Sequence, residues 1–334
     1  MSIPPDAAAP LDVETLRRRH YNAVIADERF HHGAVMVIRV VPDIPIPAPN
    51  PGQWLELGLG LWERPMQGTE AGSARRKSPD ALIRRSYSLS SPILGQDGTS
   101  LLEPSGLDGF EFFLSLVVPP EERARHAPNL TGRLFCLRPG ARLFLSDHPM
   151  GEYSLDPVEP GNDVLFLATG TGEAPHNFMI WALLRSDHPG RVASIVSVRR
   201  RGDLAYDPVH RRLTSLFPQY RYASLVTREH AEPKKHLQDL LEDGSLETMA
   251  GFPLDPARTQ IYLCGNPGMI GPPRIFDGER RYPHTLGMVE LLERRGFNAD
   301  LRRSPVNLHY ERYWLVGAAG GVRGVSNGGG RGAR

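Results

Sequence analysis

Residues 163–175 read DVLFLATGTGEAP and decide the fold of this chain. The apolar run over residues 164–168 is typical of a buried strand, and Gly170 and Gly172 follow it directly. Glycine permits a tight turn and a close approach by a ligand, and Pro175 suits the first turn of a helix predicted over residues 174–186. A strand, a glycine turn and a helix N-terminus present free N–H groups to an anion, so the stretch predicts a site for a phosphate-bearing cofactor.

The segments after this stretch continue the same alternation. Strands are predicted over residues 193–198, 222–227 and 261–265, with helical stretches between or after them, and a later helix over 284–296 stops at Gly296. Alternating strands and helices are typical of a parallel α/β sheet. The turn lacks the full G-x-G-x-x-G spacing, so the usual dinucleotide fingerprint is absent and the phosphate prediction depends on agreement with other motifs.

The segments before residue 163 have a different pattern. Short β-rich runs, bounded by Gly, Pro or Asp, recur without a long helical repeat, and this predicts a closed antiparallel barrel. We place a flexible leader at residues 1–19, the barrel at 20–160, the α/β domain at 161–316 and a disordered Gly-rich tail at 317–334; residues 63–84 form a surface loop. The predicted barrel strands cover residues 21–30, 33–41, 52–62, 85–92, 110–118 and 140–147.

Length, net charge and cysteine content limit the kinds of protein to which this chain can belong. The 334 residues favour two domains, and a net charge of +1 argues against nucleic acid as the main partner. Cys136 and Cys264 are the only cysteines, so we expect no disulfide framework, a reducing cytoplasm, and neither an iron–sulfur cluster nor another metal site. No run has the length of a membrane span, and the N-terminus lacks the apolar core of a signal peptide.

Four separated motifs together resemble the ferredoxin–NADP reductase family, particularly its bacterial type. The resemblance spans residues 20 to 314 and implies a barrel that binds FAD followed by a domain that binds NADP(H). The motifs are RSYS at 85–88, GTGEAP at 170–175, CGNPGM at 264–269 and NLHYERYW at 307–314.

The resemblance assigns the first motif to FAD. It implies that Arg85 pairs with the pyrophosphate, that Tyr87 packs along the flavin, and that Ser88 forms a hydrogen bond near the hydride-accepting nitrogen. These roles suit the residues, because a guanidinium matches phosphate oxygens and a phenol offers a flat apolar face. Leu130 and Thr131 resemble a second pyrophosphate contact, whereas Arg133 is expected to be a surface charge.

The C-terminal motifs complete the resemblance. Cys264 and Gly265 are expected against the nicotinamide, although a cysteine that ends a strand can equally be a small buried hydrophobe. In bacterial relatives the final aromatic pair reaches FAD, which implies the same role for Tyr313 and Trp314. The turn of Gly170, Thr171, Gly172 and Pro175 is expected to bind the nucleotide phosphates.

Charge predicts which nucleotide binds. NAD selection usually places an acidic residue after the second strand of the nucleotide fold, but here Arg199 and Arg200 follow it. Positive charge favours the additional phosphate of NADP, and Arg228 resembles a second contact to that phosphate. Glu173 stands where the family usually has an apolar residue; we expect an acid in the first helical turn, with proton delivery as the alternative.

The resemblance implies an FAD-dependent oxidoreductase that exchanges hydride with NADP(H) and single electrons with ferredoxin or flavodoxin. Ser88, Cys264 and Tyr87 would take part in catalysis. The protein partner would bind transiently through electrostatic attraction, and the enzyme would be a monomer without membrane or nucleic-acid partners. The alternatives are a flavin reductase that serves a cytochrome or oxygenase component, and a non-catalytic flavin-binding subunit.

Overall fold

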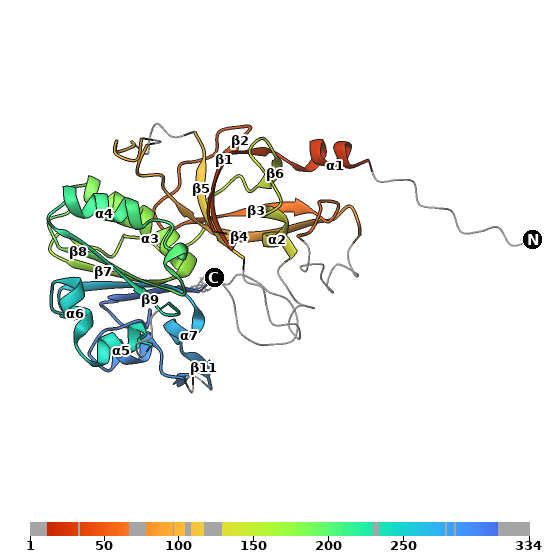
Figure 1. Ribbon diagram of the computed structural model, residues 1–334. Coiled ribbons are helices and arrows are strands. Elements are labelled where there is room, and N and C mark those ends of the chain that lie inside the picture. The colour runs from red at the N-terminus through yellow and green to blue at the C-terminus, as the bar shows by residue number, and fades with distance from the viewer. Residues whose placement is uncertain are drawn as a thin grey trace, which may run out of the picture.

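The computed structural model describes most of the chain, with gaps. The described residues are 12–32, 34–66, 78–95, 97–103, 108–116, 129–229, 234–277, 279–283 and 285–312. Tyr313, Trp314, the predicted tail at 317–334 and part of the predicted loop at 63–84 lie outside these ranges. Figure 1 shows the two halves of the chain, coloured red to yellow and green to blue.

The first half is a closed antiparallel barrel, so this part of the predicted fold is confirmed. Its strands follow the order β1-β2-β5-β4-β3-β6, and all six predicted strands are present. Alternate residues point inward and fill the barrel with side chains such as Ile38, Leu57 and Phe112, each 0% exposed. The bounds are β1 Ala23–His32, β2 Val35–Pro42, β3 Trp54–Gly60, β4 Leu82–Ser90, β5 Phe110–Ser115 and β6 Arg142–Leu145.

The second half contains a five-stranded sheet in the order β13-β10-β7-β8-β9, in which every pairing is parallel. This confirms the predicted α/β architecture. Strands β7 and β10 are buried along almost their whole length, as expected for a sheet covered on both faces. The bounds are β7 Asp163–Thr169, β8 Val192–Val198, β9 Tyr220–Val226, β10 Thr259–Gly265 and β13 Leu308–Arg312.

Helices cover the two faces of this sheet. In Figure 1, α3 and α4 lie between the sheet and the barrel, whereas α5 and α6 lie on the opposite side. None of the helices in the described ranges combines the length and the apolar character that a bilayer crossing requires. The bounds are α2 Asn129–Leu134, α3 Glu173–Arg185, α4 Asp207–Leu216, α5 Leu237–Glu242, α6 Ser245–Ala250, α7 Pro267–Ile270 and α8 Met288–Glu293; the 3-10 helices are η4 Gly170–Gly172 and η5 Arg201–Asp203.

Three elements differ from the sequence prediction. Helix α1, Val13–His20, lies within the segment expected to be a flexible leader, because Asp12 caps it and Arg17 bonds the buried Glu63. The predicted helix at 284–296 is shorter, since α8 ends at Glu293; Gly296, with φ 92°, follows it as predicted. A small hairpin, β11 Arg274–Phe276 and β12 Glu279–Arg281, was not expected.

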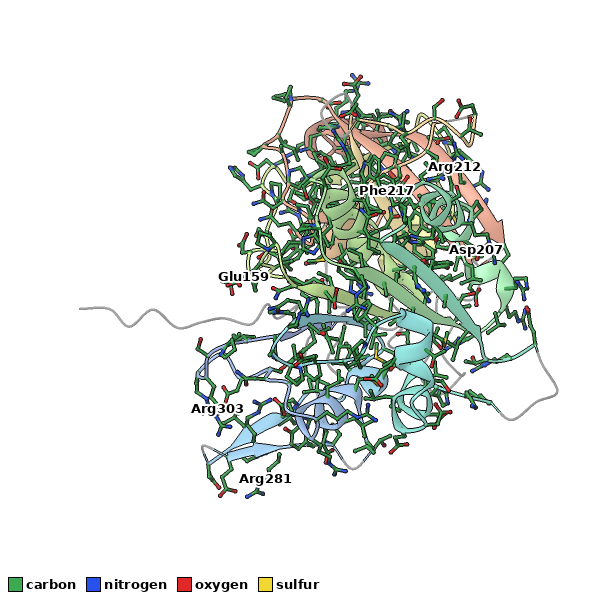
Figure 2. All side chains as sticks on the ribbon, turned by 90° about the vertical axis from the view of Figure 1, so that its left-hand side faces the viewer. Glu159, Asp207, Arg212, Phe217, Arg281 and Arg303 are labelled. Atoms are coloured by element: carbon green, nitrogen blue, oxygen red, sulfur yellow. The ribbon has the colours of Figure 1, made fainter. Side chains whose placement is uncertain are left out.

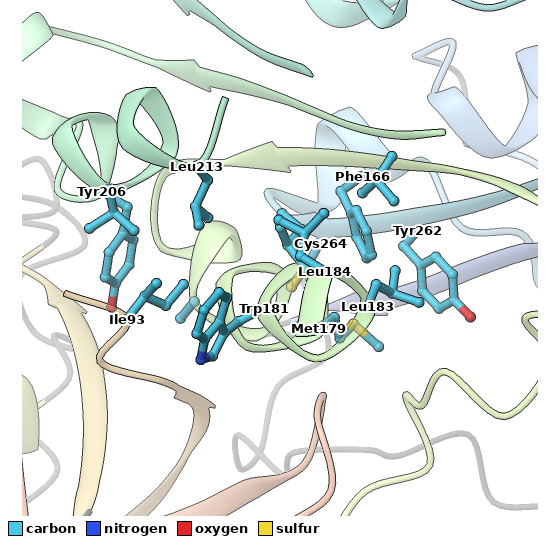
Figure 3. Packing of buried hydrophobic residues seen from close by; sticks show 14 of the residues in the cluster. Ile93, Phe166, Met179, Trp181, Leu183, Leu184, Tyr206, Leu213, Tyr262 and Cys264 are labelled. Atoms are coloured by element: carbon cyan, nitrogen blue, oxygen red, sulfur yellow. The ribbon is translucent and has the colours of Figure 1, made fainter. Parts of the chain in front are cut away.

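One hydrophobic cluster joins the two halves. It contains barrel residues Val37 and Phe113 together with Tyr206, Trp181 on α3 and Cys264 on β10. Figure 3 shows part of this cluster around α3. In addition, Asn177 of α3 donates hydrogen bonds to Ser90 Oγ (2.9 Å) and to the Ser91 carbonyl (2.7 Å). The helix that follows the glycine turn is therefore fastened to the end of β4.

Candidate active site between the barrel and the sheet

The glycine turn lies directly against the end of the neighbouring strand. Gly170 has φ 53°, and residues 170–172 form η4 immediately before α3. A Cβ on Gly172 would lie 2.2 Å from the carbonyl oxygen of Cys264, so glycine is required there for the two backbones to touch. The predicted glycine turn is therefore present. It lies at the carboxyl end of β7, the position at which open α/β sheets bind ligands.

The CGNP motif forms the other side of this contact. Gly265 has φ 123°, and a Cβ there would lie 2.3 Å from Thr169 Oγ1. The same Oγ1 accepts a 2.7 Å hydrogen bond from the backbone N–H of Asn266. Cys264 is fully buried in the cluster beneath α3 (Figure 3), which agrees with its reading as a small buried hydrophobe; a catalytic role stays a prediction.

The RSYS motif lies on β4, facing α2. The Tyr87 hydroxyl is 3.0 Å from Thr131 Oγ1, and both Thr131 and Leu130 are buried. Burial lowers the pKa of Arg85, and no acceptor contacts its guanidinium among the described residues. A half-buried guanidinium with no acceptor in the described part of the chain, on the same strand as the Tyr87 phenol, fits a flavin nucleotide whose pyrophosphate would supply the acceptor.

Ser88 connects the barrel motif to the sheet. Its Oγ donates a 3.2 Å hydrogen bond to Glu311 Oε2, and Glu311 pairs in register with Cys264. Burial raises the pKa of Glu311 to about 7, against an ordinary value of 4.5. The motifs RSYS and CGNP therefore meet at a carboxyl group that can hold or release a proton near neutral pH.

Glu311 is a functional candidate that the sequence analysis missed. It belongs to the quoted segment NLHYERYW, but attention there fell on Tyr313 and Trp314. A single acidic residue two positions before an aromatic pair carries no signal of burial. Only the pairing of β13 with β10 shows where its side chain lies.

The predicted NADP arginines lie together at the sheet edge. Arg199 follows β8 and Arg228 follows β9, and the Arg228 N–H donates a 2.9 Å hydrogen bond to the Arg199 carbonyl. Their side chains and that of Arg200 are exposed. Exposed arginines whose backbones lie side by side at the carboxyl ends of neighbouring strands fit the additional phosphate of NADP.

The burial of two charged residues differs from the sequence analysis. Arg133 was expected to be a surface charge, but it is 5% exposed, and its Nε donates a 3.0 Å hydrogen bond to the Glu63 carbonyl. Glu173 stands in the first turn of α3, as expected, but its side chain is fully buried there. Its Oε1 lies 3.3 Å from His210 Nε2 and 3.5 Å from the Tyr222 hydroxyl, so its partners are α4 and β9.

Comparison with known proteins agrees with this geometry. The family model for the oxidoreductase NAD-binding domain matches residues 166–272. A ferredoxin–NADP reductase of Pseudomonas aeruginosa is 30% identical over 183 residues, which cover 51% of this chain and 67% of that protein.

Solved structures support the fold over a longer stretch. A Neisseria gonorrhoeae ferredoxin–NADP reductase, solved with bound FAD and NADP, has a TM-score of 0.64 at 19% identity and covers 88% of this chain and 98% of its own. An Amycolatopsis cytochrome P450 reductase has a TM-score of 0.56 at 20% identity and covers 88% of this chain and 69% of its own. With the motifs, the barrel and the parallel sheet in place, the chain belongs to the ferredoxin–NADP reductase family.

Proposed function

We propose that this protein is an FAD-dependent oxidoreductase that exchanges a hydride with NADP(H) and passes single electrons to ferredoxin or flavodoxin. One observation carries the proposal: the hydrogen bond between Ser88 and Glu311 brings the flavin motif of the barrel to the nucleotide motif of the sheet. When bound, FAD supplies the conversion between two-electron and one-electron chemistry. Binding of the cofactors and movement of the proton would depend on the chain's own residues.

The binding residues divide between the two halves. Arg85, Tyr87 and Thr131 would hold FAD from the barrel side, with Leu130 as an apolar wall. The turn of Gly170, Thr171 and Gly172 would hold the pyrophosphate of NADP(H) at the start of α3, which Pro175 stiffens. Arg199, Arg200 and Arg228 would bind the 2′-phosphate.

The polar groups at the junction would manage the proton. Ser88 lies within hydrogen-bond distance of Glu311, whose pKa of about 7 lets it carry a proton at neutral pH. Cys264 and Gly265 would provide a small, dry surface against the nicotinamide, since the cysteine is fully buried and glycine has no side chain. Tyr87 would pack on the ring system from the barrel side.

The test is an anaerobic titration of the purified protein with NADPH and, separately, NADH, followed by ferredoxin. We expect the flavin absorbance to bleach at lower NADPH than NADH and to return when oxidised ferredoxin is added. A protein that lacks flavin and cannot be reconstituted with it would contradict the proposal. So would a flavin that stays oxidised after NADPH is added.

A flavin reductase that serves a cytochrome is the second candidate, favoured by the fold likeness to the Amycolatopsis cytochrome P450 reductase. It differs only in the acceptor. Bleaching by NADPH without reoxidation by ferredoxin or flavodoxin, but with reoxidation by a cytochrome, would select it.

A further inference from the structure

The loop that carries Arg199 and Arg200 is attached to the barrel by a side chain from the β1 hairpin. His32 Nε2 contacts Asp203 Oδ1, and Asp203 closes η5 directly after the arginines. The His32 ring also packs on Gly202, where a Cβ would lie 3.0 Å from His32 Cδ2. A histidine of the predicted flavin domain thus touches the nucleotide loop.

The contact of the second ring nitrogen of His32, Nδ1, indicates which tautomer the ring adopts. The backbone N–H of Ala34 donates a 3.1 Å hydrogen bond to His32 Nδ1, so Nδ1 is an acceptor and carries no proton. Nε2 must then carry the proton and donate it to Asp203. With this tautomer the ring satisfies both contacts and is fixed in one orientation, so His32 holds Asp203 in place.

Asp203 passes this contact to the arginine loop. Its other carboxylate oxygen accepts a 2.9 Å hydrogen bond from the backbone N–H of Arg200. The Arg199 carbonyl in turn accepts from the Arg228 N–H. A continuous series of contacts therefore runs from the barrel through Asp203 to the backbone of all three arginines.

A second attachment lies three residues further on. Tyr206 is 1% exposed, and its hydroxyl donates a 2.9 Å hydrogen bond to Glu111 Oε1 on β5. The Arg29 guanidinium donates a 2.6 Å hydrogen bond to the other oxygen of Glu111. The Tyr206 ring also meets Phe113 edge to face at 5.5 Å. Figure 2 shows this side of the molecule: Asp207, at the start of α4, lies near the barrel, whereas Arg281 and Arg303 lie at the far end.

We propose that His32 is a positioning residue for recognition of the 2′-phosphate: through Asp203, the barrel holds the backbone of Arg199 and Arg200 beside the backbone of Arg228. The proposal rests on the proposed function, because it assumes that these arginines bind that phosphate. The side chains of Arg199, Arg200 and Arg228 are exposed, so their placement depends on this backbone. A loop held in its binding conformation loses less entropy on binding.

The test is binding of two probes to the full-length, flavin-loaded protein by calorimetry. Adenosine 2′,5′-bisphosphate carries the 2′-phosphate and 5′-AMP lacks it, so the ratio of the two dissociation constants reports 2′-phosphate recognition. We expect His32→Ala to reduce this ratio by about threefold to tenfold, the range of one hydrogen bond, with 5′-AMP affinity unchanged. His32→Gln should recover most of the loss, because an amide can donate to Asp203 and accept from Ala34.

His148→Ala is the matched control. His148 is an exposed barrel histidine that pairs with Asp147 of its own loop, and its removal should leave the ratio unchanged. A wild-type protein that binds both probes equally would overturn the proposed function. If the wild type prefers the bisphosphate and His32→Ala keeps the full preference, only the positioning role of His32 is overturned. An equal loss of affinity for both probes would also overturn the positioning role, since a general loss of packing does not distinguish a probe with the 2′-phosphate from one without it.

Discussion

Ser88 on barrel strand β4 donates a hydrogen bond to Glu311 on sheet strand β13, 223 positions away in sequence. The contact joins the two halves at the point where their motifs meet. Because burial raises the pKa of Glu311 to about 7, this carboxyl is neutral below that pH and ionised above it. The junction therefore changes charge near neutral pH.

This titration predicts a pH effect on flavin reduction. We expect the rate constant of wild-type flavin reduction by NADPH to show an ionisation near pH 7, and Glu311→Gln to abolish it, because an amide does not titrate. Stopped-flow flavin reduction from pH 5.5 to 8.5 measures both. Glu279→Gln, an exposed carboxylate on β12, should keep the ionisation. An unchanged profile in Glu311→Gln would rule out this group.

The half-buried Arg85 predicts a loss of FAD. We expect Arg85→Ala to weaken FAD binding about tenfold to a hundredfold, the effect of removing a charge-assisted hydrogen bond. Flavin fluorescence during equilibrium dialysis measures the dissociation constant. Arg84→Ala is the control, since the neighbouring guanidinium is exposed and lies over the Phe144 ring at 3.9 Å. Equal effects of the two substitutions would contradict a specific role for Arg85.

Gly172 predicts a steric effect on folding and nucleotide binding. In Gly172→Ala the new methyl group would meet the Cys264 carbonyl at 2.2 Å, so the turn and the strand end must separate. We expect a loss of about 1–3 kcal/mol in unfolding free energy, typical of overpacking, together with weaker NADPH binding. Gly161→Ala, which meets nothing within 4 Å, should have little effect. Urea unfolding and NADPH titration distinguish the two variants.

The buried contact of Glu173 with His210 predicts a strong dependence of stability on one partner. Tyr220 bonds His210 Nδ1 at 2.8 Å, which leaves Nε2 for Glu173. His210→Ala should cost about 3–5 kcal/mol, because it removes the buried imidazole beside the fully buried acidic group of Glu173. Adding Glu173→Gln should recover part of that loss. Arg211→Ala, on the exposed side of the same helix, should change stability by less than about 1 kcal/mol; a similar small effect of His210→Ala would show that Glu173 is buried uncharged.

The proposed protein partner predicts a salt effect. If ferredoxin binds through opposite charges, turnover at subsaturating ferredoxin should fall about tenfold as ionic strength rises from roughly 0.05 to 0.5 M, because screening shortens the range of attraction. Turnover with a neutral quinone is the control and should change little. Salt-independent turnover with ferredoxin would contradict electrostatic docking.

Local patterns were sufficient to predict most of the fold. Alternating residues defined the six barrel strands, and continuous apolar runs defined β7 and β10, because burial on one face or on both leaves a distinct periodicity. Strand β13 was not among the predicted strands. Its five residues, LHYER, are mostly polar, and His309, Tyr310 and Glu311 are only partly buried at the sheet edge.

The site was predictable where a motif acts through its own backbone. The glycines at 170 and 172 predict a tight turn, and the structure has a turn at these residues. The environments of Glu173, Arg133 and Glu311 were not predictable, since each depends on a partner far away in sequence. Glu173, for example, looks like an ordinary acid at a helix start until α4 brings His210 beneath it.

The bond from Asn177 to the end of β4, and the hydrophobic cluster shared by barrel and sheet, have a practical consequence. Although the chain has two architectures, it does not divide into two separately expressible pieces. Cutting it between β6 and β7 would open Phe113, Trp181 and Tyr206 to water and leave the amide of Asn177 without its acceptors. Each fragment would then expose an apolar face that promotes aggregation, and protein prepared for biochemical work should keep both halves on one polypeptide.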